Sequence, residues 1–396
     1  MAAEAKPKDR HYWAQKFYKN ENNDDKGAAG PAHPAKHTKK KIVKVVKRDQ
    51  GNVRDAPRQD RKGSKGFGEG KGKSRGKGTT GKASSGNLID DSISQISASS
   101  EVWTIVNAIK DAAEAAFGHG VRAFPFGSSA NGFATSSSDV DVAMRVPYKE
   151  PKTVLTDREF WKALERRGFS HVQSILRAKI PIVKYTFERR NGIPREVDLS
   201  CGNTLPLFNT LLLGKYAKMC PEVSRLAAEV RAWAKEYKIH GSNQGLLSSY
   251  GFNLMTIFYM QICGILPSLQ ADCDARYFED ESKKRYDVSM ASLEHIPVLT
   301  PEQYQQAEDL TLEDFITFYL RDYRPDCVVS IRVGRLDAPG MEFQRLAPRK
   351  DSKTFIRIED PMDLSRDVGS AVSRVDHFWD GFDDAARNFD IDLRGG

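Results

Sequence analysis

The stretch that decides the fold is Phe126-Gly127-Ser128-Ser129-Ala130-Asn131-Gly132, followed five residues later by Ser138-Asp139-Val140-Asp141-Val142. Residues two apart on a β-strand point to the same face, so Asp139 and Asp141 project together while Val140 and Val142 enter a core. Two like charges held side by side repel each other, and this repulsion is costly unless a cation lies between them. Taken alone, the pair is more typical of a solvent-facing strand edge than of a metal site, so its surroundings must decide.

Two neighbouring features favour a metal site. Gly127-Ser128 precedes the pair, and glycine lets backbone N–H groups and a hydroxyl approach a phosphate closely. A third carboxylate, Asp198, lies between the apolar Val197 and Leu199 and therefore points to the opposite face of its strand. Three such carboxylates can hold two Mg²⁺ or Mn²⁺ ions about 4 Å apart, one activating a 3′-hydroxyl and one neutralising a triphosphate. The pattern predicts nucleotidyl transfer.

The net charge of +8 is unevenly distributed along the chain. Residues 1–85 hold 23 of the 61 basic residues and 9 of the 53 acidic ones, so the remainder carries 38 basic and 44 acidic residues. Residues 1–88, rich in Gly, Lys, Arg and Ser, cannot bury enough apolar surface to offset their ordering entropy, and we expect a disordered basic arm. Its role stays open between RNA attachment through counterion release, nuclear import through Lys39-Lys40-Lys41 to Arg48, and a plain tail.

Other classes of protein are disfavoured. The segment Gly76-Lys77-Gly78-Thr79-Thr80-Gly81-Lys82-Ala83 is nearly a P-loop, but Ala83 replaces the magnesium-binding hydroxyl and no apolar strand precedes it. No run of 18 apolar residues and no apolar N-terminal signal are present, so we expect no membrane span and no secretion. Five scattered cysteines without a CxxC pair indicate reduced thiols. We expect a cytoplasmic or nuclear protein, with the cytoplasm slightly favoured.

Hydrophobic periodicity predicts an α+β architecture. Residues 89–204 are expected to form a small mixed-sheet catalytic domain, whose first helix, Val102–Ala116 capped by Ser99 or Ser100, can also pack on the second domain. Its further elements are an extended segment to Phe126, a helix at 157–167 and strands at 139–146, 179–188 and 193–200, the last two joined by Arg190-Asn191-Gly192. Residues 205–396 are expected to be mainly helical, with helices at 221–238 and 250–266, strand-like composition at 324–358 and a cleft between the domains.

The motifs occur in an order that resembles a known family. Gly127-Ser128 with Asp139-x-Asp141 is similar to the signature of the DNA polymerase β-type nucleotidyltransferases. The order continues with Val197-Asp198-Leu199, Asn209-Thr210-Leu211-Leu212-Leu213, Val230-Arg231-Ala232-Trp233-Ala234-Lys235, Leu247-Ser248-Ser249-Tyr250-Gly251 and Ile358-Glu359-Asp360-Pro361-Met362-Asp363-Leu364-Ser365-Arg366. This set, over residues 100–385, resembles the non-canonical poly(A) polymerases and terminal uridylyltransferases, which add nucleotides to RNA 3′ ends without a template.

The resemblance implies roles for individual residues. The three aspartates are implied as metal ligands, in agreement with the strand argument. Gly127, Ser128 and Ser249 are implied as triphosphate contacts, Asn209 and Thr210 as contacts to the ribose and base edge, and Tyr250 as a platform for the base. Arg231, where the family usually carries lysine, and Lys235 share a helix face that suits an anion; the alternative is two solvated charges beside Glu229 and Glu236.

The choice of base depends on a loop near residues 358–370. Uridylyltransferases of the family commonly place a histidine where this chain has Arg366, and Arg366 can either crowd out a purine or hydrogen-bond a base carbonyl. Asp363 matches an acidic residue that accepts from uracil N3–H or from the adenine amino group, and Met362 stands where the family tends to have an aromatic. The expected substrate is UTP, with ATP as the alternative.

Two other functions remain as alternatives. A catalytically inactive RNA-binding scaffold would keep the fold without turnover, although three uncompensated carboxylates argue against it. The same fold could instead act on a nucleotide, an antibiotic or a protein. No zinc-finger spacing or separate RNA-binding motif is present, so RNA selection is assigned to the basic arm, to surface patches or to a protein partner. We expect a monomer.

Overall fold

The computed structural model describes residues 93–135, 138–178, 180–188, 193–271, 277–279, 285–287, 296–323, 327–336 and 356–392. The basic arm, the P-loop-like segment, the Arg190-Asn191-Gly192 turn and Cys273 all lie outside these ranges. Within them, no helix combines the length and apolar character needed to cross a membrane. Among the described residues, Cys201, Cys220, Cys263 and Cys327 form no disulfide.

The first domain is a five-stranded mixed sheet. Its strands are β1 (Arg122–Phe126), β2 (Val140–Arg145), β3 (Phe169–Ile175), β4 (Ile182–Phe187) and β5 (Arg195–Cys201), in the order β1-β2-β5-β4-β3. Strands β2 and β5 run parallel, and the other neighbouring pairs are antiparallel. The sheet is accompanied by the helices α3 (Ser100–Phe117), α4 (Ser128–Asn131), α5 (Pro151–Leu155) and α6 (Arg158–Glu165).

One face of this sheet builds its own core. Ile105, Ile109, Val140, Val183 and Leu199 are fully buried together. Helix α3 therefore packs on the sheet and on α6, and it begins where the sequence predicts, because Ser99 accepts a hydrogen bond from the N–H of Val102.

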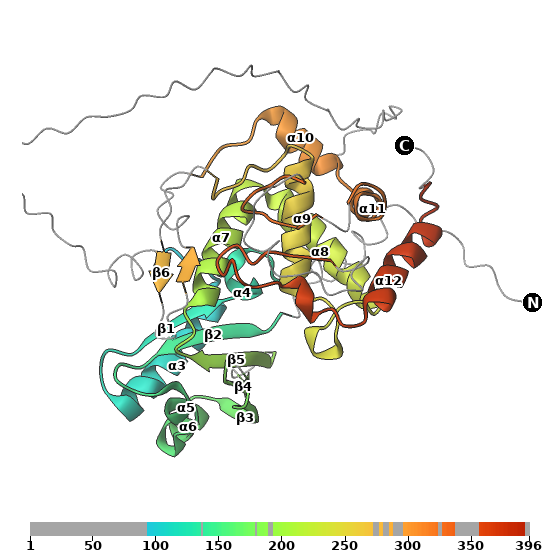
Figure 1. Cartoon of the computed structure of the whole chain (residues 1–396). Coiled ribbons are helices and arrows are strands. Elements are labelled where there is room, and N and C mark those ends of the chain that lie inside the picture. The colour runs from blue at the N-terminus through green and yellow to red at the C-terminus, as the bar shows by residue number, and fades with distance from the viewer. Residues whose placement is uncertain are drawn as a thin grey trace, which may run out of the picture.

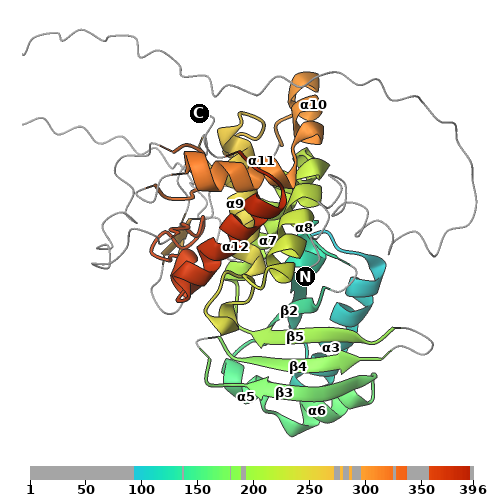
Figure 2. The same ribbon diagram turned by 90° about the vertical axis from the view of Figure 1, so that its right-hand side faces the viewer.

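The second domain is mainly helical and lies above the sheet in Figure 1 and in the view turned by 90° in Figure 2. Its helices are α7 (Leu205–Met219), α8 (Pro221–Glu236), α9 (Ser249–Ile262), α10 (Pro301–Asp309), α11 (Leu312–Thr317) and α12 (Val375–Asn388). Shorter elements are the 3₁₀ turns η1 (Ser242–Gln244) and η5 (Gly369–Ala371), the π-helical turn η3 (Phe318–Asp322) and a small antiparallel pair, β6 (Tyr277–Glu279) and β7 (Arg285–Asp287). Trp233, Phe252, Phe315 and Phe382 are fully buried at its centre.

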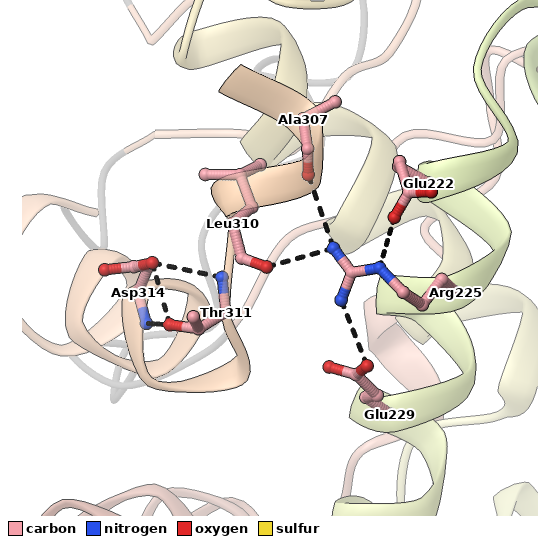
Figure 3. A network of polar contacts seen from close by, with 7 residues as sticks. All are labelled: Glu222, Arg225, Glu229, Ala307, Leu310, Thr311 and Asp314. Atoms are coloured by element: carbon pink, nitrogen blue, oxygen red, sulfur yellow. Dashed lines mark hydrogen bonds and ion pairs between the residues drawn. The ribbon is translucent and has the colours of Figure 1, made fainter. Parts of the chain in front are cut away.

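Arg225 links helix α8 to the end of helix α10 in this domain (Figure 3). The guanidinium of Arg225 on α8 pairs with Glu222 and with Glu229, whose carboxylate oxygen is 3.0 Å away. It also donates to the carbonyl oxygens of Ala307 at 3.3 Å and Leu310 at 3.0 Å, at the end of α10. The corner between α10 and α11 is thereby held on α8.

Two elements differ from the sequence prediction. Strand β3 was not predicted, because His171, Val172 and Gln173 are all exposed and a register shift between His171 and Gln173 breaks the alternation of faces. Conversely, the predicted strand character of 324–358 is wrong for the described part of that segment. Residues 327–336 form no strand: residues 331–333 make a turn, and Val329 forms an isolated bridge with Ile358.

Candidate active site

The three aspartates meet at one end of the sheet. Asp141 on β2 lies directly opposite Asp198 on β5 in the parallel register, and Asp139 is the residue before β2 begins. Val140 and Val197 have no exposed surface, so the carboxylates occupy the other face of the sheet. The predicted alternation of acidic and apolar residues is thus observed on both strands.

The carboxylates of the cluster repel one another. Burial and the neighbouring carboxylates of Asp198 and Asp139 raise the pKa of Asp141 to about 7. Burial, Glu196 and Asp198 likewise raise the pKa of Asp139. Glu196 lies two residues before Asp198 on β5 and shares its face, so a fourth carboxylate adds to the negative field. Such a set of oxygen ligands suits a divalent cation.

A lysine that the sequence analysis missed occupies this cluster. Lys184 on β4 lies opposite Asp198 in the antiparallel register, and its Nζ donates to Oδ2 at 2.6 Å and to Oδ1 at 2.8 Å. Among the described residues, no three His, Cys, Asp or Glu side chains are arranged as a ready metal site. Because Lys184 engages both oxygens of Asp198, it would compete with a metal ion for this carboxylate.

Gly127 is required by its contact with Asp141. It has φ +70°, and a Cβ at this position would overlap Oδ2 of Asp141 and lie 3.2 Å from its Cγ. Its N–H donates to the hydroxyl of Thr210 at 2.9 Å, and that hydroxyl donates to the carbonyl of Pro206 at 2.7 Å. The N–H of Gly127 therefore links α7 to the sheet, and a contact between Gly127 and a phosphate stays a prediction. Ser128 follows as the first residue of α4.

Two polar residues on α7 differ in availability. Thr210 is buried and already uses its single hydroxyl hydrogen, so a ribose would meet a lone pair there. Asn209 is half-buried, and its Oδ1 is buried without a hydrogen-bond partner among the described residues. Asn209 thus presents an acceptor suited to a ribose hydroxyl.

The two α8 cations selected from the sequence, Arg231 and Lys235, differ in exposure. Lys235 is exposed, and its charge lowers the pKa of Asp139 against the stronger effects that raise it. Arg231 is buried and donates to Oδ1 of Asn253 and, at 2.7 Å, to the carbonyl oxygen of Phe133. Desolvation lowers its pKa to about 10, so it remains charged at neutral pH.

These contacts show that Arg231 braces α9 and the segment after α4. The alternative of a solvated charge beside Glu229 is wrong for Arg231, because it is buried and Glu229 pairs with Arg225. A direct contact between Arg231 and a triphosphate stays a prediction.

Ser249 and Tyr250 begin α9. The Oγ of Ser249 lies 2.8 Å from Nε2 of His240, a residue that the sequence analysis did not select. The hydroxyl of Tyr250 is buried without a hydrogen-bond partner among the described residues, and its pKa is raised well above the usual value by burial and by Asp360, against the effect of Arg366. The ring of Tyr250 therefore adjoins the loop that carries Asp360 and Arg366.

That loop is organised by a buried carboxylate. Asp360 has no exposed surface, and its Oδ1 accepts from the N–H groups of Met362 at 3.0 Å and Asp363 at 3.2 Å. Its Oδ2 accepts from Nη1 of Arg366 at 3.1 Å, while half of the Arg366 side chain stays exposed. Oδ1 of Asp363 accepts from the Ser365 hydroxyl at 2.6 Å. Asp360 was quoted in the motif but not chosen as a site residue.

Comparison with known proteins agrees with this geometry. Residues 88–218 match the family described as poly(A) RNA polymerase, mitochondrial-like, central palm domain. Terminal uridylyltransferase 7 of Homo sapiens is 30% identical over 294 residues, which are 70% of this chain and 19% of the relative. The chain belongs to the non-canonical poly(A) polymerase and terminal uridylyltransferase family.

Other members of this family show the same likeness. Terminal uridylyltransferase cid1 of Schizosaccharomyces pombe is 29% identical over 262 residues, covering 63% of each chain. Poly(A) RNA polymerase GLD2 of Danio rerio is 30% identical over 262 residues, covering 64% of this chain and 51% of the relative. The chain thus spans less than two thirds of the length of these curated relatives.

Solved structures of the family share the fold. A cytoplasmic RNA terminal U-transferase superposes with a TM-score of 0.60 at 25% identity, covering 76% of this chain and 93% of the other. Cid1 in complex with its short product ApU gives a TM-score of 0.59 at 25% identity, covering 76% and 92%. The α+β fold predicted from the sequence is therefore confirmed.

Proposed function

We propose that this chain adds ribonucleotides to RNA 3′ ends without a template, by nucleotidyl transfer with release of pyrophosphate. The observation that carries the proposal is the pairing of Asp141 with Asp198 in adjacent parallel strands, with Gly127 packed against the Asp141 carboxylate. The relatives named terminal uridylyltransferase and poly(A) RNA polymerase support the same reaction class.

Asp139, Asp141 and Asp198 would hold two Mg²⁺ or Mn²⁺ ions. When bound, such ions supply activation of the attacking 3′-hydroxyl and charge neutralisation of the triphosphate. The raised pKa values of Asp139 and Asp141 fit this role, because a cation there would relieve their mutual repulsion. A Cid1 structure that holds a magnesium nucleotide also supports divalent-metal use.

The remaining polar residues would orient the nucleotide. Lys235 supplies an exposed ammonium beside the carboxylates, and Ser249 supplies a hydroxyl at the start of α9. Asn209 offers an unpartnered carbonyl oxygen to a ribose hydroxyl. Tyr250 offers an aromatic ring next to the base-recognition loop. The hydroxyl group of this tyrosine is buried. Excluding water strengthens each of these polar interactions.

We propose UTP as the favoured nucleotide, with ATP as the alternative. Arg366 is anchored on Asp360 through Nη1, so its outward guanidinium N–H groups can only donate. Uracil presents two carbonyl acceptors on its pyrimidine ring, whereas the adenine amino group is a donor that would meet another donor. Leaving such a group unpaired costs about 1–3 kcal/mol. The Cid1 complex with a UTP analogue supports this choice.

Extension of a labelled RNA oligonucleotide with each NTP separately, in Mg²⁺ or Mn²⁺, tests the proposal. We expect extension with UTP above ATP, and none for the double variant Asp139→Ala/Asp141→Ala with unchanged circular dichroism. Absence of extension by folded wild-type protein with every NTP would refute the proposed reaction. RNA binding without turnover would instead favour an inactive scaffold.

A further inference from the structure

His240 is fixed at the edge of the nucleotide site by three contacts. It follows α8 and forms a parallel bridge with Leu247. Its ring stacks on Phe252 with centroids 6.1 Å apart and an interplanar angle of 18°. Its Nε2 lies 2.8 Å from the Oγ of Ser249, the first residue of α9. Because backbone and ring are both held, the imidazole has one defined direction, toward the serine hydroxyl.

The charges around His240 keep it neutral. Burial, Lys235 and Arg231 lower its pKa to about 4. Lys235 also lowers the pKa of Asp139, so one ammonium influences both the carboxylate cluster and the His240–Ser249 pair. The Lys235 ammonium, which an incoming triphosphate would approach, is thus within electrostatic range of the pair.

A neutral imidazole decides which way the serine hydrogen points. The Ser249 hydroxyl has one hydrogen. When Nε2 carries the imidazole proton, it donates to Oγ and leaves the serine hydrogen directed outward. Successive hydrogen bonds aligned toward an anion reinforce one another, so a triphosphate beside Lys235 selects this tautomer.

We propose that His240 is a positioning residue, which orients the Ser249 hydroxyl to donate to the triphosphate of the incoming nucleotide. The proposal rests on the proposed function, since it assumes that the chain binds a nucleoside triphosphate. His240 makes no contact with the nucleotide in this scheme, and its effect passes entirely through Ser249.

Three substitutions at His240 distinguish a role in orienting the Ser249 hydroxyl from a role in packing alone. His240→Leu removes the N–H donor, whereas His240→Gln carries an amide nitrogen at about the reach of Nε2. His240→Asn is too short to reach Ser249 and replaces the leucine variant where that variant does not fold. The matched control is His377→Leu. His377 lies on α12 and contacts the carbonyl oxygen of Lys238, two residues before His240, at 3.0 Å. It has no bond to Ser249 in this contact.

The measurement is the dissociation constant of a non-hydrolysable UTP analogue. It is determined by isothermal titration calorimetry on the full chain with Mg²⁺. We expect His240→Leu, or His240→Asn in its place, to weaken binding about fivefold to tenfold, as for one lost hydrogen bond to a charged group. His240→Gln should restore most of the affinity, and His377→Leu should leave it unchanged. UMP, which lacks the terminal phosphates, should bind all variants alike.

A double-mutant cycle with Ser249→Ala completes the test. If His240 acts through the serine, its replacement should have no further effect on affinity in the Ser249→Ala background. Additive losses, or equal losses for His240→Leu and His240→Gln, would overturn the proposal. Nucleotide binding without RNA extension would refute the proposed function alone, because the binding cycle reports on His240 independently of turnover.

Discussion

Lys184 and Asp198 form a two-pronged ion pair within the carboxylate cluster, with Nζ 2.6 Å and 2.8 Å from the two carboxylate oxygens. The Lys184 ammonium acts as an internal counter-ion for a site whose other carboxylates repel one another. Lys184 and a divalent cation would therefore compete for Asp198. Removal of the lysine should destabilise the metal-free protein and increase the stabilisation that a bound cation provides.

We expect Lys184→Met to lower the free energy of unfolding of the metal-free protein by about 1–2 kcal/mol, between the values of exposed and buried ion pairs. The stabilisation gained on adding Mn²⁺ should be larger in this variant than in the wild type, because Asp198 is free to bind the ion. Chemical denaturation with and without Mn²⁺ measures both effects. Lys162→Met, which breaks an exposed pair with Glu159, is the control. An equal response to Mn²⁺ would contradict the competition.

Gly127→Ala should inactivate the protein without unfolding it. The added Cβ overlaps Oδ2 of Asp141, so the carboxylate must leave its position, while the rest of the sheet core is untouched. Gly264→Ala is the matched control, because Gly264 has a similar φ of +76° but open space around its Cβ position. Both variants should lose about 1–3 kcal/mol of stability from a backbone with positive φ. Only Gly127→Ala should lose RNA extension, and equal activities would refute the assigned role.

Arg366 is expected to control the choice of base. Arg366→Ala removes the donors that face the nucleotide, so the ratio of kcat/KM for UTP over ATP should fall about tenfold, corresponding to about 1.4 kcal/mol. Arg366→Lys keeps the charge near Asp360 but loses the forked donor set, and it should retain only part of the preference. Extension assays with UTP and ATP in competition measure the ratio. An unchanged ratio in Arg366→Ala would assign the choice of base to another residue.

The local part of this site could be predicted from the sequence, since strand alternation alone sets the faces of Asp139, Asp141 and Asp198. The partners that modify the site are distant in sequence, and no periodicity reveals them. Thr210 is 83 residues from Gly127, and Phe133 is 98 residues from Arg231. Only the folded chain shows that Arg231 is a buried brace while Lys235 is exposed.

The same reasoning applies to elements. Helix α3 was predicted because its apolar stripe and its serine cap are local signals. Strand β3 was missed because its pairing with β4, and not its own pattern, makes it a strand. Lys184 escaped notice for a related reason. A lysine between Val183 and Tyr185 is also what a solvent-facing strand position looks like, and its partner lies on the next strand.

The Arg225 network should matter for stability and leave catalysis unaffected (Figure 3). Arg225→Met leaves Glu222 and the buried Glu229 without their cation and removes the donors to Ala307 and Leu310.

We expect a loss of about 3 kcal/mol in the free energy of unfolding, the cost typical of breaking one side of a buried ion pair. Arg387→Met is the control, because the Arg387–Asp384 pair is exposed and should contribute less than about 1 kcal/mol. Urea denaturation measures both variants, and extension rates well below the unfolding temperature should match the wild type. A loss of kcat in folded Arg225→Met would show instead that the α10–α11 corner influences the site through α8.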